Sequence, residues 1–128
     1  MKRNRRFLDP GWVAVLSFFA LLCSAPEPSR GHMLPSHAEP KVGATVTGSP
    51  SHVRIWFDSA MDPASSTITV LDESGRKVDR GDGRVNTSDA TLLEVSLSPL
   101  SSGIYRVLWN VTGRDGHRSV GDFTFAVK

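Results

Sequence analysis

The chain contains 128 residues, a length typical of one domain, with 15 Lys/Arg, 13 Asp/Glu and a single cysteine. Residues 1–31 hold five of the basic and two of the acidic residues, so residues 32–128 carry ten basic against eleven acidic side chains. This nearly neutral balance excludes the strongly positive surface on which nucleic-acid binding depends, and we expect no nucleic-acid partner. Cys23, the one cysteine, also lies in residues 1–31. The remainder has no disulfide and must be held together by its apolar core.

Residues 1–31 are predicted to be a secretory signal peptide, followed by a working domain over residues 32–128. Four basic residues near the N-terminus precede an apolar run from Trp12 to Cys23 and then a polar stretch of prolines and small residues. That run is too short to span a membrane comfortably. An uncleaved N-terminal anchor and lipidation of Cys23 are the alternatives. Cleavage after Ala25 would leave a proline first, which favours cleavage after Gly31.

From residue 32 onward the pattern is that of an all-β domain. Apolar and polar residues alternate with a period of two, which indicates strands with one buried face. The alternating stretches are 53–57, 67–70, 93–97, 105–111 and 123–127. Turn-forming clusters separate them, and this spacing favours a β-sandwich. Trp109 is predicted to be in the core and Trp56 on the opposite face of its strand, while Asp62 and Pro63 predict one helical turn.

Histidines supply the only distinctive chemistry, and they indicate metal ligation. The four are His32, His37, His52 and His117, and Asp115 lies two residues before the last of them. An Asp-Gly pair between strands is most often only a turn. If cleavage made His32 the first residue, however, its α-amine and imidazole together would chelate one ion. With Asp115 and His117 the set becomes three nitrogens and one oxygen, which suits Cu(II).

Two stretches carry a resemblance to a known family. "HMLPSHAEPKVGATV" begins at His32, and "LSSGIYRVLWNVTGRDGHRSVGDFTFAV" spans residues 100–127. Together with the intervening sequence they resemble the CopC-type periplasmic copper-binding proteins over residues 32–128. The resemblance implies an all-β, seven-stranded, Greek-key sandwich of the immunoglobulin-like or cupredoxin-like kind. It also implies one Cu(II) per chain, bound by His32, Asp115 and His117, and therefore cleavage between Gly31 and His32.

The resemblance implies a non-enzymatic periplasmic copper carrier or buffer that serves copper homeostasis and resistance. A separate CopD-type inner-membrane copper importer is then a possible partner, and we expect a monomer. Two features depart from the family pattern. Met33 and Met61 are the only methionines after residue 31, so no second, soft Cu(I) site is expected. Gly113 stands where the family usually has serine, which we expect to change the loop rather than the ligands.

His37 and His52 match no ligand position and are predicted to be surface residues, with His37 close enough in sequence to support the site. Two other functions remain open. An N-terminal histidine paired with a second histidine also resembles the site of copper-dependent polysaccharide monooxygenases, which would make the protein an enzyme. A metal-free immunoglobulin-like interaction module is the third reading. Oxygen turnover with a polysaccharide and a reductant, or an apo protein after copper dialysis, would distinguish them.

Overall fold

The structure is a computed structural model, and it describes residues 33–128. The predicted signal peptide and His32 lie outside the described residues. No helix among residues 33–128 is long and apolar enough to cross a membrane.

Residues 33–128 form eight strands and one short 3-10 helix. The strands are β1 (Pro35–Glu39), β2 (Thr45–Val46), β3 (His52–Phe57), β4 (Thr67–Leu71), β5 (Arg84–Val85), β6 (Leu92–Ser96), β7 (Gly103–Thr112) and β8 (Arg118–Val127). The helix, η1, spans Pro63–Ser65. The resemblance implied seven strands, so the structure has one more, and two of its strands, β2 and β5, are only two residues long.

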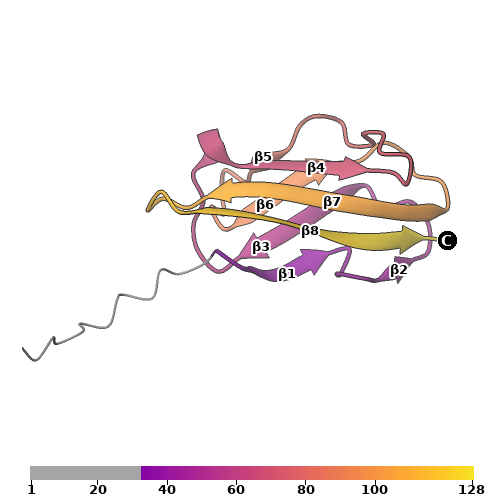
Figure 1. Cartoon of the computed structure of the whole chain (residues 1–128), viewed down its shortest axis with the longest axis horizontal. Coiled ribbons are helices and arrows are strands. Elements are labelled where there is room, and N and C mark those ends of the chain that lie inside the picture. Colours follow the sequence, from indigo (N-terminus) through magenta and orange to yellow (C-terminus); the bar gives the residue numbers. More distant parts are fainter. Residues whose placement is uncertain (1–32) are drawn as a thin grey trace, which may run out of the picture. The chain divides into compact units, whose positions relative to one another are not determined.

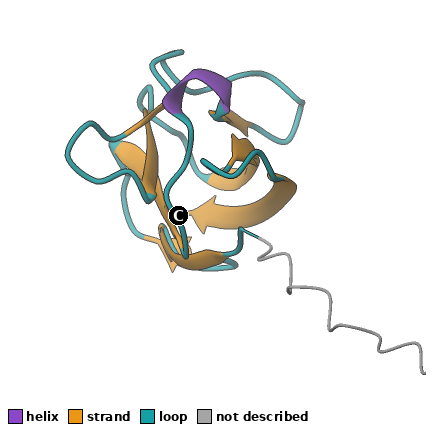
Figure 2. Cartoon of the chain, turned by 90° about the vertical axis from the view of Figure 1, so that its left-hand side faces the viewer, coloured by secondary structure: helices purple, strands orange, loops and turns teal. Residues whose placement is uncertain are grey.

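The strands form two four-stranded sheets that pack face to face, which confirms the predicted sandwich. One sheet has the order β1-β3-β6-β5 and the other β2-β8-β7-β4. All neighbours are antiparallel except β2 and β8. The β7–β8 hairpin is the longest element, and its tip projects past the ends of the other strands (Figure 1). Viewed from that end, the strands surround a common interior with η1 at one rim (Figure 2).

The core is built from the residues that the alternation predicted to face inward. In β3, for example, Val53, Ile55 and Phe57 are buried while the residues between them are partly exposed. The same pattern holds along β4, β6 and the inner positions of β7 and β8. The fully buried side chains come from both sheets and from one loop: Val53, Ile55, Met61, Val70, Leu93, Val95, Val107, Val111 and Phe125.

Trp109 packs against this core, as predicted. Its indole lies 6.1 Å from the ring of Phe57 and 6.2 Å from that of Phe123, measured between centroids. It covers Gly121 on the neighbouring strand, where a Cβ would overlap the indole. Trp56 instead lies on the outer face of its sheet, where it packs against His37 with a centroid distance of 5.0 Å.

The predicted helical turn is also present. The Asp62 carboxylate accepts a hydrogen bond from the Ala64 amide at 3.1 Å, and Pro63 occupies the first helical position. The amide of Asp62 donates to the Thr112 carbonyl at 2.7 Å, and Met61 pairs with Gly113 in an isolated β-bridge. The segment before η1 is therefore bonded to the end of β7 and to the first residue of the turn that follows it.

Candidate metal centre

The tip of the β7–β8 hairpin consists of residues 113–117, and its hydrogen bonds make it a well-defined turn. The Gly113 amide donates to the His117 carbonyl at 2.8 Å, and the Gly116 amide donates to the Gly113 carbonyl at 2.9 Å. Gly116 has a φ of 87°, a conformation that residues with a Cβ rarely adopt. The Asp-Gly sequence thus makes the turn, and the turn brings Asp115 and His117 together.

Asp115 and His117 form a close pair on the surface of this turn. One oxygen of the carboxylate, Oδ2, lies 2.8 Å from His117 Nδ1, and the other, Oδ1, accepts the His117 amide at 3.1 Å. The two side chains are 60% and 44% exposed, respectively, so an ion can reach both. The hydrogen bond from the His117 side chain, followed by that from its amide, holds the pKa of Asp115 below its ordinary value.

This pairing fixes the role of each imidazole nitrogen. Because an ionised carboxylate only accepts hydrogen bonds, His117 Nδ1 is the donor in the 2.8 Å contact. In a neutral imidazole the other nitrogen, Nε2, then keeps its lone pair. A carboxylate that orients a histidine in this way is common beside metal ions. The pair therefore offers one imidazole nitrogen and carboxylate oxygens from a single short turn.

His32, the third predicted ligand, lies outside the described residues, but the residue that follows it is placed. Met33 is 3% exposed and belongs to the core. A Cβ built on Gly113 would lie 2.8 Å from Met33 Sδ and 2.7 Å from Asp115 Oδ1. The residue next to His32 is therefore packed against the same turn that carries Asp115 and His117.

The structure pairs His37 with groups away from the turn. Its Nε2 lies 3.3 Å from Glu39 Oε1, and its ring packs on Trp56 on the outer face of the β1-β3-β6-β5 sheet. The side chain is 48% exposed. The prediction of a surface residue is confirmed, and among residues 33–128 no hydrogen bond or ring contact links His37 to Asp115 or His117.

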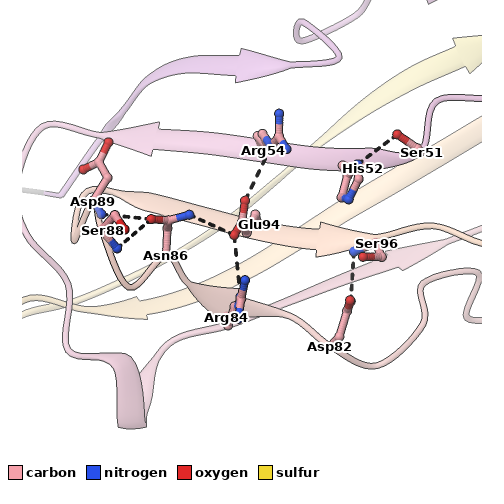
Figure 3. Close-up of polar contacts among 10 residues, drawn as sticks. All are labelled: Ser51, His52, Arg54, Asp82, Arg84, Asn86, Ser88, Asp89, Glu94 and Ser96. Carbon is pink, nitrogen blue, oxygen red and sulfur yellow. Dashed lines mark hydrogen bonds and ion pairs between the residues drawn. The ribbon is translucent and has the colours of Figure 1, made fainter.

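His52 lies beside a polar network on the same outer face, shown in Figure 3. Its Nδ1 lies 2.8 Å from Ser51 Oγ, so it too is a surface residue. At the centre of the network Glu94 is only 12% exposed, with Arg54 Nε at 3.5 Å and Arg84 Nε at 3.6 Å. Asp82 accepts the Ser96 amide at 2.9 Å, and hydrogen bonds from Ser96 lower its pKa. The acids here serve internal cross-strand bonds.

Among residues 33–128 no group of three or more His, Cys, Asp or Glu side chains has the spacing of a metal site. Asp115 and His117 are only two candidate ligand residues, and tight binding needs more. Sequence reasoning identified this pair but missed the contact between Met33 and Gly113. Met33 and Gly113 are 80 positions apart, so their spacing in the sequence does not reveal the contact. The only signal was Gly113 itself, which departs from the family pattern.

The two packed sheets and the exposed acid–imidazole pair define an immunoglobulin-like β-sandwich that carries candidate metal ligands on its longest hairpin. The chain belongs to the CopC family, because the family model for the CopC domain matches residues 36–128. The match covers every strand from β2 to β8 and all but the first residue of β1. It includes the hairpin with Asp115 and His117.

Similar proteins agree with this assignment. Protein YobA of Escherichia coli strain K12 is 29% identical over 94 residues, which cover 73% of this chain and 76% of that protein. The crystal structure of CopC from Methylosinus trichosporium OB3b has a TM-score of 0.67 and 29% identity, covering 76% of this chain and 94% of that one. PcoC, a methionine-rich copper resistance protein from Escherichia coli, has a TM-score of 0.65 at 22% identity, covering 77% and 100%. The PcoC likeness shows the fold alone.

Proposed function

We propose that this protein is a non-enzymatic copper-binding protein of copper homeostasis and resistance. Its membership of the CopC family favours this function over a copper-dependent monooxygenase and over a metal-free interaction module. The observation that carries the proposal is the pairing of Asp115 with His117 at 2.8 Å on an exposed turn within the matched domain. The family also supports a periplasmic location, which would require the predicted signal peptide over residues 1–31.

The proposed site holds one Cu(II), bound by His32 through its α-amine and imidazole and by Asp115 and His117. Three nitrogens and one oxygen form the tetragonal set that Cu(II) prefers, and Cu(II) has the highest affinity in the divalent series. The burial of Met33 beside Gly113 supports this ligand set, because His32 is covalently joined to Met33. A CopD-type importer as partner and a monomeric state complete the proposal.

A second, soft site for Cu(I) is not part of the proposal. Cu(I) binding of the soft type uses several thioether sulfurs. The two methionines of residues 33–128 are 3% and 0% exposed, and both lie in the core: Met33 and Met61. Neither is presented on the surface.

The decisive experiment changes the N-terminus. The domain is produced beginning at His32, and again with Gly-Ser before His32, and each is titrated with Cu(II) against a competing chelator. The extension turns the α-amine into an amide, so the affinity should fall by orders of magnitude while the circular dichroism spectrum stays the same. Electron paramagnetic resonance of the unextended form should show a tetragonal signal with nitrogen couplings. Equal affinities in the two forms would exclude the amine as a ligand.

The pH dependence of binding gives an independent check. Copper ligands must be deprotonated, and the reference pKa values are about 8 for an α-amine and about 6.5 for histidine. The apparent affinity of the unextended form should therefore drop steeply as the pH falls from neutral. The extended form has lost the amine, so its affinity should depend less steeply on pH above about 7. Parallel pH profiles would contradict the ligand set.

A further inference from the structure

We infer that Met33 and Gly113 form a positioning pair for the proposed copper site: the Met33 side chain packs where a Cβ of residue 113 would lie, and this contact anchors the chain next to residue 32 to the turn that carries Asp115. This inference rests on the proposed function and deepens it. Met33 acts here through packing and is not itself a ligand.

The contact is specific to a glycine at this position. A Cβ on Gly113 would lie 2.8 Å from Met33 Sδ and 2.7 Å from Asp115 Oδ1, closer than real Cβ contacts come. The sulfur and the carboxylate oxygen thus share one small space. Any side chain at 113 would have to push out the thioether, the carboxylate or both. The backbone of Gly113 is not left-handed, so only the space favours glycine, and the atoms that a Cβ would meet are the ends of two flexible side chains.

Two further contacts hold Met33 and Gly113 in place. The chain immediately after Met33 is held at both backbone groups of Leu34, whose amide donates to Asp58 Oδ1 at 3.2 Å and whose carbonyl accepts the Asp58 amide at 3.1 Å. On the other side, Gly113 pairs with Met61 in a β-bridge, and Met61 is fully buried. Both partners of the contact are therefore fixed to the body of the sandwich.

Fixing Met33 restricts the residue before it. Consecutive Cα atoms are about 3.8 Å apart across a trans peptide bond, so the Cα atom of the preceding residue must lie at that distance from the Cα atom of Met33. An N-terminal residue on a free chain end would sample many positions, and metal binding would have to order it. Anchoring Met33 by its buried side chain would leave less of the chain for metal binding to order.

The test compares three substitutions in the domain that begins at His32. Met33→Ala removes the side chain that packs against Gly113 and should weaken Cu(II) binding by about 10–100-fold, the range expected when the support of a ligand is removed. Met33→Leu keeps a large apolar side chain without the sulfur, and its Cu(II) affinity should be within a few-fold of that of the wild type. Leu97→Ala is the matched control, because Leu97 is also buried, at 4% exposure, and lies beyond the end of β6 that is remote from the turn. It should lower the melting temperature and leave the Cu(II) affinity unchanged.

Gly113→Ala probes the same contact from the other side and should also weaken Cu(II) binding. In the Gly-Ser-extended form only the His32 imidazole remains to be positioned, so Met33→Ala should have a smaller effect there than in the unextended form. Equal Cu(II) affinities of Met33→Ala and the wild type would overturn the inference, and so would an equal loss in Leu97→Ala. A loss in Met33→Leu as large as in Met33→Ala would show that the sulfur is a ligand and that positioning is wrong. If the wild type binds Cu(II) no better than its extended form, the proposed ligand set fails, whatever the effect of Met33→Ala.

Discussion

The packing of Trp109 over Gly121 allows a prediction whose size can be worked out from the structure. The two residues are direct partners across β7 and β8. A Cβ on Gly121 would overlap Trp109 Cζ2 and lie 2.8 Å from both Cε2 and Cη2. These are atoms of a rigid ring, so Gly121→Ala must rotate or displace the whole indole. Overpacking of a core costs about 1–3 kcal/mol, and displaced aromatic pairs cost about 0.5–1.5 kcal/mol each.

We therefore expect Gly121→Ala to lower the free energy of unfolding by about 3 kcal/mol. For a domain of this size, each kcal/mol corresponds to about 4–8 °C in melting temperature, so the drop should be about 12–24 °C. Thermal and urea unfolding followed by circular dichroism measure both quantities. Gly48→Ala is the control: nothing lies within 4 Å of its Cβ, and only its φ of 81° opposes the change. It should cost about 1 kcal/mol.

A double-mutant cycle tests the steric reason. Phenylalanine at 109 lacks the outer ring atoms that a Cβ at 121 would meet, and it also removes the indole Nε1, which is buried without a hydrogen-bond partner within residues 33–128. Trp109→Phe combined with Gly121→Ala should be less destabilised than the sum of the single changes, by about 1 kcal/mol or more. Additive effects, or a Gly121→Ala variant as stable as Gly48→Ala, would refute the steric reasoning.

Two further predictions concern the turns. Asp115→Ala and His117→Ala should each weaken Cu(II) binding, measured by chelator competition, and should keep a cooperative thermal transition without copper, because both side chains are exposed. If either apo variant lost that transition, the residue would be structural. Hydrogen bonds from Ser or Thr side chains, and then from backbone amides, hold three other aspartate pKa values below their ordinary value: Asp72, Asp82 and Asp89. Such groups stabilise the fold above the unfolded pKa of about 4, so the apo melting temperature should fall as the pH is lowered through and below that value. A melting temperature that is flat from pH 5 to pH 2.5 would contradict this.

The fold was largely predictable because alternation reports burial directly. A strand with one face in the core must place apolar residues at every second position, and residues 105–111 and 123–127 do so without interruption. The helical turn at Pro63 was predictable for a similar reason, since its cap and its first residue are neighbours in the chain. Strands β1, β2 and β5 were not predicted: β1 buries only one of its five residues, and the two residues of β2 or of β5 cannot display a period.

The candidate site likewise has one part that the local sequence predicted and one part that it did not. Asp115 and His117 are two residues apart on one turn, so their proximity follows from the local sequence, and the structure places them in contact. The packing of Met33 against Gly113 depends on how β1 leaves the sandwich relative to the β7–β8 hairpin, which is a property of the whole fold. A glycine in a loop shows only that a Cβ is absent. It does not show which distant side chain occupies the space.

The contact between Asp115 and His117 also limits how the proposed site can take up a metal ion. Both carboxylate oxygens already take part in hydrogen bonds, since Oδ2 faces His117 Nδ1 and Oδ1 accepts the His117 amide. A metal ion held by His117 Nε2 would leave these bonds intact, and Asp115 would orient the imidazole and balance the charge of the ion. A metal ion bound at Nδ1 must displace the carboxylate from that nitrogen. The hydrogen bond from the His117 amide to Oδ1 would still hold the carboxylate within the turn, so the displaced Oδ2 would stay close to the ion. Asp115, which would obstruct binding at Nδ1, is therefore also the residue best placed to become a ligand.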